Sequence, residues 1–190
     1  MRLRTRLLVL SVSTVAVIVT ALFALHLDSL TNTWLESAVE RSLVAGKLIQ
    51  SVMFLHITDS SANTPAASIE ETKSNWTRIV TDDKELADRL VEQAAMPKGV
   101  IVEINIVGEN GKVILSSIPS RTGQPAPVRQ SLASLQDAGF LDQLSAIAKP
   151  DTDYETRIPL GIMSDPDQQK PIFEIQLLVS SCNTGGMFTA

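Results

Sequence analysis

The amino-terminal part of the chain is a long apolar run with a basic flank. Residues 7–27 contain no Asp, Glu, Lys or Arg, whereas Arg2, Arg4 and Arg6 precede them. A helix rises about 1.5 Å per residue and the hydrocarbon layer is about 30 Å thick, so about twenty apolar residues cross it. The pattern predicts a transmembrane helix over residues 7–27 behind a cytoplasmic basic flank over residues 1–6.

The charges on the two sides of this run predict its orientation. Short basic flanks stay in the cytoplasm, and the acidic residues Asp28, Glu36 and Glu40 follow the run, so the rest of the chain is expected outside the cell membrane. The alternative is a cleaved signal peptide, which has a shorter apolar core of about 7–15 residues and a small-x-small cleavage site. The length of the run and the lack of a clean Ala-x-Ala near its end favour an uncleaved anchor.

Helical periodicity continues beyond the predicted membrane span. Apolar residues recur at spacings of three, four or sums of these, which predicts a long exiting helix over residues 28–57. Such a stripe packs either on its own domain or on a twin helix as a coiled-coil seam, and the two arrangements are compatible. The residues of the stripe are Leu27, Leu30, Trp34, Ala38, Ala45, Ile49 and Val52.

Residues 58–181 have the pattern of one α+β domain. A polar loop over 58–68 precedes two short helices, and then the period changes from helical to alternating. Asn110-Gly111 joins two β-branched runs and predicts a hairpin, because both residues tolerate positive φ. We therefore expect an antiparallel sheet with flanking helices. The expected helices cover 70–81, 84–95 and 128–149 with a break at Gly139, the expected strands cover 100–107, 113–118, 153–160 and 171–180, the expected loops cover 119–127 and 163–170, and an irregular tail covers 182–190.

Composition excludes several functional classes. The net charge of -5 argues against a nucleic-acid surface, because phosphate recognition needs concentrated Lys and Arg. Cys182 is the only cysteine, and His26 and His56 lack metal-ligand spacing, so no disulfide, metal or cofactor is expected. The sequence also contains no catalytic motif of the hydrolase, phosphate-loop or zinc-protease types, and we expect no enzyme activity in this chain.

The order of these elements resembles a known family. A basic-flanked anchor, a long exiting helix and a hairpin with Glu-Asn-Gly-Lys at residues 109–112, then Ser-Ser-Ile-Pro-Ser at 116–120 and Arg-Thr-Gly-Gln at 121–124, are similar to the extracytoplasmic PAS-like (Cache) sensor region of bacterial two-component sensor histidine kinases. The resemblance implies a single-pass protein of the bacterial inner membrane with a periplasmic or extracellular sensor domain. It also implies a homodimer through the long helix and a small organic ligand bound on a face of the sheet.

Six polar residues are the candidates for such a ligand site. Arginine suits a carboxylate ligand, and Tyr and Asn can orient a small molecule. The competing interpretation is ordinary solvent exposure, which polar residues that alternate along a half-buried strand adopt without any ligand. The candidates are Glu103 and Asn105 on the first strand, Ser116 on its partner, Arg121 in the following loop, and Tyr154 and Arg157 on a later strand.

The end of the sequence departs from the plan of these receptors. Residues 182–190 contain no second apolar run, and neither histidine has the Glu and Pro pattern of a phosphoacceptor helix. We expect an amino-terminal sensor fragment that lacks a kinase core. The alternative function is a membrane-anchored envelope module that binds or assembles another protein and has no small-molecule ligand.

Overall fold

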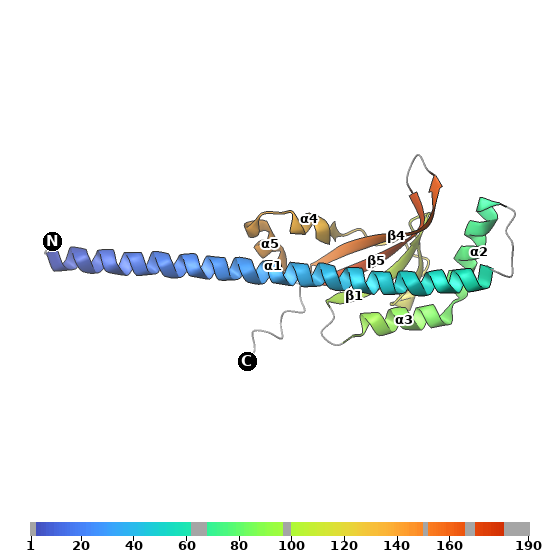
Figure 1. Cartoon of the computed structure of the whole chain (residues 1–190), viewed down its shortest axis with the longest axis horizontal. Coiled ribbons are helices and arrows are strands. Elements are labelled where there is room, and N and C mark those ends of the chain that lie inside the picture. Colours follow the sequence, from blue (N-terminus) through green and yellow to red (C-terminus); the bar gives the residue numbers. More distant parts are fainter. Residues whose placement is uncertain (1–2, 62–67, 97–99, 150–151, 166–169, 181–190) are drawn as a thin grey trace.

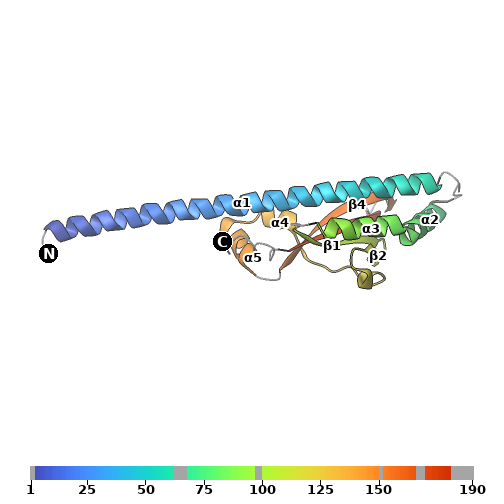
Figure 2. The same ribbon diagram turned by 90° about the horizontal axis from the view of Figure 1, so that it is seen from below.

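One helix dominates the molecule. The structure is a computed structural model that describes residues 3–61, 68–96, 100–149, 152–165 and 170–180 (Figure 1). Helix α1, Leu3–Ser61, is continuous over 59 residues, which corresponds to about 90 Å. Its amino-terminal half extends beyond the remainder of the chain, as both views in Figures 1 and 2 show. The predicted long helix is confirmed, and it has no break at the expected boundary between residues 27 and 28.

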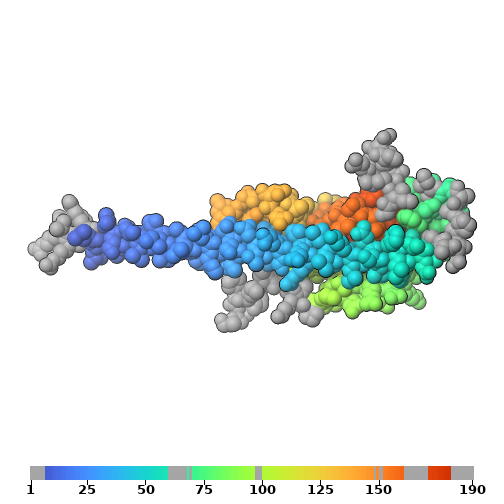
Figure 3. Space-filling model, in the orientation of Figure 1, coloured from blue at the N-terminus to red at the C-terminus, as the bar shows by residue number. Residues whose placement is uncertain are grey.

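The two halves of α1 have different surroundings. Residues 7–26 are all exposed, and an 18-residue window in this half has a mean hydropathy of 2.5, with none of it buried. Figure 3 shows this half standing clear of the domain. By length and composition it is a candidate membrane span, and its exposure argues against the core helix of a soluble protein.

The carboxyl-terminal half of α1 is a wall of the hydrophobic core. Of the predicted stripe, Ala38, Ala45 and Ile49 are buried, whereas Leu30 is 51% exposed and Trp34 only partly buried. The buried face is therefore rotated slightly from the predicted one. Its buried apolar residues are Leu35, Ala38, Ala45, Ile49, Met53 and Ile57.

Two short helices follow α1, close to the predicted positions. Helix α2 covers Ile69–Asp82, and α3 covers Lys84–Ala94. Ser68 caps α2 by accepting from the backbone N–H of Glu71, and Asp83 caps α3 by accepting from that of Leu86. Leu86 and Leu90 bury one side of α3 in the core.

The sheet has five strands in the order β2-β1-β5-β4-β3. All neighbouring pairs are antiparallel except β3 and β4, which pair in parallel through Gln130 with Tyr154 and Ser131 with Glu155. The expected purely antiparallel sheet is therefore wrong in this detail, because a two-residue strand had no sequence signal of its own. The strands are β1 Ile101–Gly108, β2 Val113–Ser116, β3 Gln130–Ser131, β4 Asp153–Asp165 and β5 Lys170–Ser180.

The predicted hairpin between β1 and β2 is confirmed. Gly111 adopts a φ of 73°, and the side-chain oxygen of Asn110 accepts a 3.0 Å hydrogen bond from the backbone N–H of Lys112. Both features match the Asn-Gly turn chemistry. The turn fixes the register that pairs Asn105 with Ser116.

The segment between β2 and β4 contains one short 3-10 turn, η1, Pro119–Arg121, and two helices. Helices α4, Leu132–Gln136, and α5, Phe140–Ala148, are separated at Gly139 as predicted, and both pack on α1. Leu132, Leu135 and Ala146 join the same core as α1.

Some predicted boundaries need correction. Strands β4 and β5 extend through Asp165 and from Lys170, so half of the loop expected over 163–170 is strand, and the other half, 166–169, lies outside the described residues. In the loop expected over 58–68, α1 extends to Ser61, while residues 62–67 are outside the described part of the chain. The tail expected over 182–190 also lies outside it.

Candidate functional site

The two faces of the sheet have opposite chemistry. Alternate residues of β1 and β5, such as Ile104, Ile106, Ile175 and Leu177, belong to the core that includes α1. The other face carries polar side chains, and sequence patterning predicted that water covers it. That expectation is wrong, because Glu103 and Asn105 are 5% and 0% exposed.

Residues 117–129 cover this polar face. The carbonyl of Pro127 accepts from Gln176 Nε2, and the backbone N–H of Arg129 donates to Glu155 over 3.2 Å. Arg121 from the same segment lies 3.5 Å from Glu103. The segment is therefore attached to β1, β4 and β5 by polar contacts.

Strand register aligns four polar residues into one row. Asn105 of β1 pairs with Ser116 of β2 and with Gln176 of β5, and Gln176 pairs with Arg157 of β4. Directly paired residues of an antiparallel sheet point to the same face. Three of the six candidate residues, Asn105, Ser116 and Arg157, thus meet in one row across the sheet.

Asn105 lies at the centre of the row. Its amide nitrogen donates to Glu103 Oε1 over 2.8 Å and to Gln176 Oε1 over 3.3 Å. Since both neighbours are acceptors, the nitrogen must face them and the orientation of the amide is fixed. Asn105 Oδ1 is then the one buried side-chain polar atom, among the described residues, without a hydrogen-bond partner. An orphaned buried acceptor of this kind is costly and indicates a missing donor.

Glu155 connects the row to the covering segment. Its carboxylate accepts from Gln176 Nε2 over 2.7 Å, and it also receives Arg157 Nε over 2.8 Å. Arg157 in turn donates to Glu174 over 3.1 Å. The hydrogen bonds to Glu155 raise the pKa of Arg157 above its ordinary value, and the charge of Glu174 adds to this effect.

The remaining candidates lie around this network. Ser116 is 3% exposed, and its hydroxyl accepts from the backbone N–H of Ile118 at the start of the covering segment. Arg121 is partly exposed beside Glu103. Tyr154 lies on the opposite face, 1% exposed in the apolar core, where burial raises its pKa. The structure therefore brings five of the six candidates to one face and separates Tyr154 from them.

Sequence analysis missed three members of the network: Glu155, Glu174 and Gln176. Each alternates with apolar residues in a strand that had been identified, so the period-2 pattern placed them on the polar face. No signal distinguished them from solvated residues, because the covering segment has no regular pattern.

A shallow cavity of about 400 Å³ opens beside the network. Val107, Val128 and Pro171 supply its apolar lining, and Arg157 and Glu174 supply charge. A cavity of this size, with an apolar lining and a few convergent polar groups, suits a small organic ligand. Within the described part of the chain, no group of three His, Cys, Asp or Glu side chains can hold a metal ion.

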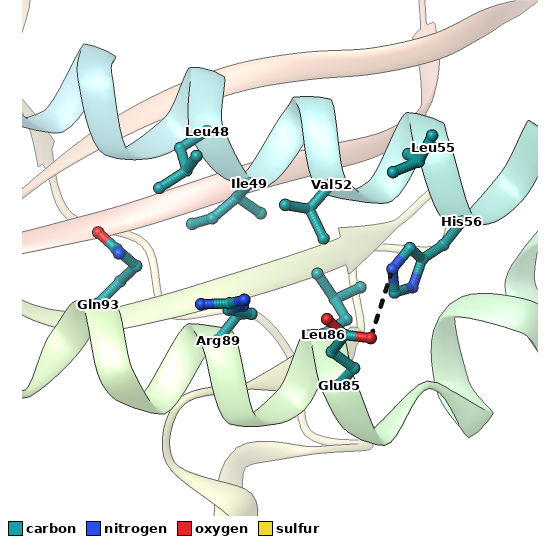
Figure 4. Close-up of a pocket in the computed structure, with 9 residues that line it drawn as sticks. All are labelled: Leu48, Ile49, Val52, Leu55, His56, Glu85, Leu86, Arg89 and Gln93. Carbon is teal, nitrogen blue, oxygen red and sulfur yellow. Dashed lines mark ion pairs between the residues drawn. The ribbon is translucent and has the colours of Figure 1, made fainter.

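A second cavity, of about 340 Å³, separates α1 from α3 (Figure 4). Leu48, Ile49 and Val52 of α1 point toward α3, as Figure 4 shows. His56 closes one end, where it pairs with Asp83 and lies 3.9 Å from Glu85. This cavity has an aliphatic wall on α1, and its polar side chains are His56, Glu85, Arg89 and Gln93.

Comparison of the sequence with protein-family models and with curated proteins finds no match.

Proposed function

We propose that this chain is the membrane-anchored extracytoplasmic sensor segment of a signal-transduction receptor of the two-component histidine kinase type. The buried polar row and its cavity form the ligand site, and α1 carries the response toward the membrane. The chain itself performs no catalysis and acts through a ligand's differential affinity for two arrangements of the domain.

The continuity of α1 is the observation that carries this proposal. A single helix provides the exposed apolar stretch over residues 7–26 and, further along, the buried core residues from Leu35 to Ile57. The core face of the sheet packs on this helix, while the polar row lies on the reverse face of the same strands. A change at the polar row therefore reaches the helix through one layer of strands.

The proposal includes a homodimer through α1. Leu30, Val44, Leu48 and Leu55 are each about half exposed or more. At 100° per residue they lie within about 40° of one another, on a strip beside the buried face of the helix, where Leu48 and Leu55 also border the cavity toward α3. A stripe with this spacing matches a coiled-coil seam, and two anchored helices would meet along it in parallel.

Disulfide cross-linking in membranes tests this arrangement. Leu55→Cys places a thiol on the stripe, and Phe54→Cys places one about 100° away on an equally exposed residue, since both side chains are 66% exposed. Both variants carry Cys182→Ser, which removes the only native thiol. We expect efficient dimer formation from Leu55→Cys, little from Phe54→Cys, and a change in cross-linking yield when a ligand binds.

Results of two kinds would contradict the proposal. Equal cross-linking at both positions, or none at either, would contradict the homodimer. A reporter fused after Ser180 that is reached only from the cytosol, or a polypeptide that does not sediment with membranes, would contradict the sensor role. Tight capture of an envelope protein, with no response to any metabolite, would instead favour an assembly module.

A further inference from the structure

We propose that the cavity beside Arg157 binds a small organic cation, with an ammonium group and a short aliphatic body. This inference rests on the proposed sensing function and names the ligand class for the same face of the sheet. A cationic ligand differs from the carboxylate ligand that the sequence analysis expected from Arg121 and Arg157.

The walls of the cavity suit such a molecule. The turn between β1 and β2, the strands β4 and β5 and the covering segment enclose about 400 Å³. Val107, Val128 and Pro171 provide aliphatic surface, and Glu109 and Glu174 bring carboxylates to the rim. An aliphatic body and an ammonium group each find a complementary surface there.

Arg157 is already engaged by carboxylates. Its guanidinium makes a bidentate contact with Glu155, over 2.8 and 3.3 Å, and a third hydrogen bond to Glu174. A carboxylate ligand would have to compete with both glutamates for this one cation.

The charges around the cavity also favour a cation. Glu109 is paired with Lys73 over 3.3 Å, and Lys73 is also paired with Glu70 over 3.1 Å. Among the residues that line the cavity, Glu109 and Glu174 carry negative charge and Arg157 carries positive charge. The excess of negative charge attracts a cation and repels an anion.

The hydrogen bonds on the same face of the sheet also favour a cationic ligand. The two N–H groups of Asn105 and those of Gln176 are all donated to acceptors within the network. What remains is a buried acceptor, Asn105 Oδ1. Asn105 lies two residues, about 7 Å, along β1 from Val107 in the cavity wall. The unpaired buried side-chain atom among the described residues is therefore an acceptor, the kind of group to which an ammonium group donates and a carboxylate does not.

Calorimetric titration of the purified full chain in detergent micelles tests the ligand class. The probes are butylammonium, butyrate and n-butanol, which share a carbon skeleton and differ in charge. We expect butylammonium to bind at least about fivefold more tightly than the other two, with an affinity that falls as salt is added. The ratio of the butylammonium affinity to the butyrate and n-butanol affinities decides the ligand class, because the apolar contribution is common to all three probes.

Three variants locate the binding. Glu174→Gln removes a carboxylate at the cavity and should weaken butylammonium binding about fivefold. Val128→Trp fills the cavity from a position that is 78% exposed, and should weaken binding without affecting folding. Glu92→Gln makes the same charge change on the exposed face of α3 and should leave binding unchanged.

Each contrary outcome is distinct. Butyrate binding as tightly as butylammonium would overturn the ligand class and leave the sensor proposal standing. Unaltered butylammonium binding in Val128→Trp would place the ligand elsewhere and overturn the inference. No binding of any probe would also overturn it, whereas the sensor role is decided separately by cross-linking and by the Ser180 reporter.

Discussion

Gly46 of α1 lies directly against Ile158 of β4. A β-carbon at position 46 would overlap Cδ1 of Ile158, and it would also come within 3.3 Å of Leu177 Cδ1. The backbone of α1 thus packs closely on the sheet at Gly46, and the absence of a side chain permits that approach.

Filling this contact should destabilise the domain. Gly46→Val forces Ile158 and Leu177 to move, and we expect the free energy of unfolding to fall by about 2 kcal/mol, as overpacking typically costs. Urea denaturation of the full chain in micelles measures this free energy, with the fluorescence of Trp34 and Trp76 as the signal, since both pack on the core. Ile158→Ala in the same chain should recover part of the loss, whereas Lys47→Val on the exposed side of the helix should change little. A Gly46→Val variant as stable as the parent would contradict the close packing.

The polar network should contribute to stability as well as to binding. Glu155→Ala removes a carboxylate that is 8% exposed and accepts from both Gln176 Nε2 and Arg157, which retain only their bonds to Pro127 and Glu174. We expect a loss of about 2–3 kcal/mol, below the cost of breaking a fully buried pair because Arg157 remains 38% exposed. The matched variant Glu92→Ala breaks an exposed pair with Arg89 and should cost about 0.5 kcal/mol or less. Equal losses in the two variants would show that the network is not coupled to folding.

Tyr154 should make stability depend on alkaline pH. Burial raises its pKa in the folded state above the ordinary value of 10.0. A group with a raised folded pKa contributes its full stability below the unfolded pKa, so stability should decline as pH rises through and above about 10. The chain has only one tyrosine, and its tyrosinate absorbance therefore reports this residue alone. Tyr154→Phe should flatten the alkaline decline, and a normal tyrosine titration in the folded protein would refute the prediction.

Asp83 joins α1, α2 and α3 at one point. Its carboxylate caps α3 through a 2.9 Å bond from the N–H of Leu86 and also pairs with His56 of α1. Asp83→Ala should therefore cost more than Ser68→Ala, which removes only the exposed cap of α2, by about 1 kcal/mol. Asp83→Asn, which keeps a capping oxygen, should fall between the two. The three variants are compared by urea denaturation, and equal losses would mean that the contact with His56 adds nothing.

Local patterns predicted the elements of this fold well. The period of 3.6 along α1 and the Asn110-Gly111 turn are short-range features that can be recognised directly in the sequence. The parallel pairing of β3 with β4 was missed, because two residues carry no period and their pairing depends on tertiary contacts.

The candidate site was predicted only in part, for a related reason. Alternation along β1 correctly placed Glu103 and Asn105 on the face away from the core, but it predicted water over them. What covers them is an irregular segment held by the carbonyl of Pro127 and the backbone N–H of Arg129. Contacts made by backbone groups do not depend on the identity of the side chain, so the pattern of side chains in the sequence did not predict this cover. Tyr154 was grouped with Arg157 because they share a strand, although their odd spacing places them on opposite faces.

The shared use of α1 limits how the folded domain can be separated from the apolar stretch. Thr31 and Leu35, at 5% and 1% exposed, are already enclosed by the folded domain, shortly after the apolar stretch ends. A protease that cut the chain between Leu35 and Ile57 would remove part of the hydrophobic interior along with the apolar stretch. Separation of an intact folded domain from residues 7–26 is therefore confined to cleavage before Thr31, because a cut between Leu35 and Ile57 also removes core residues.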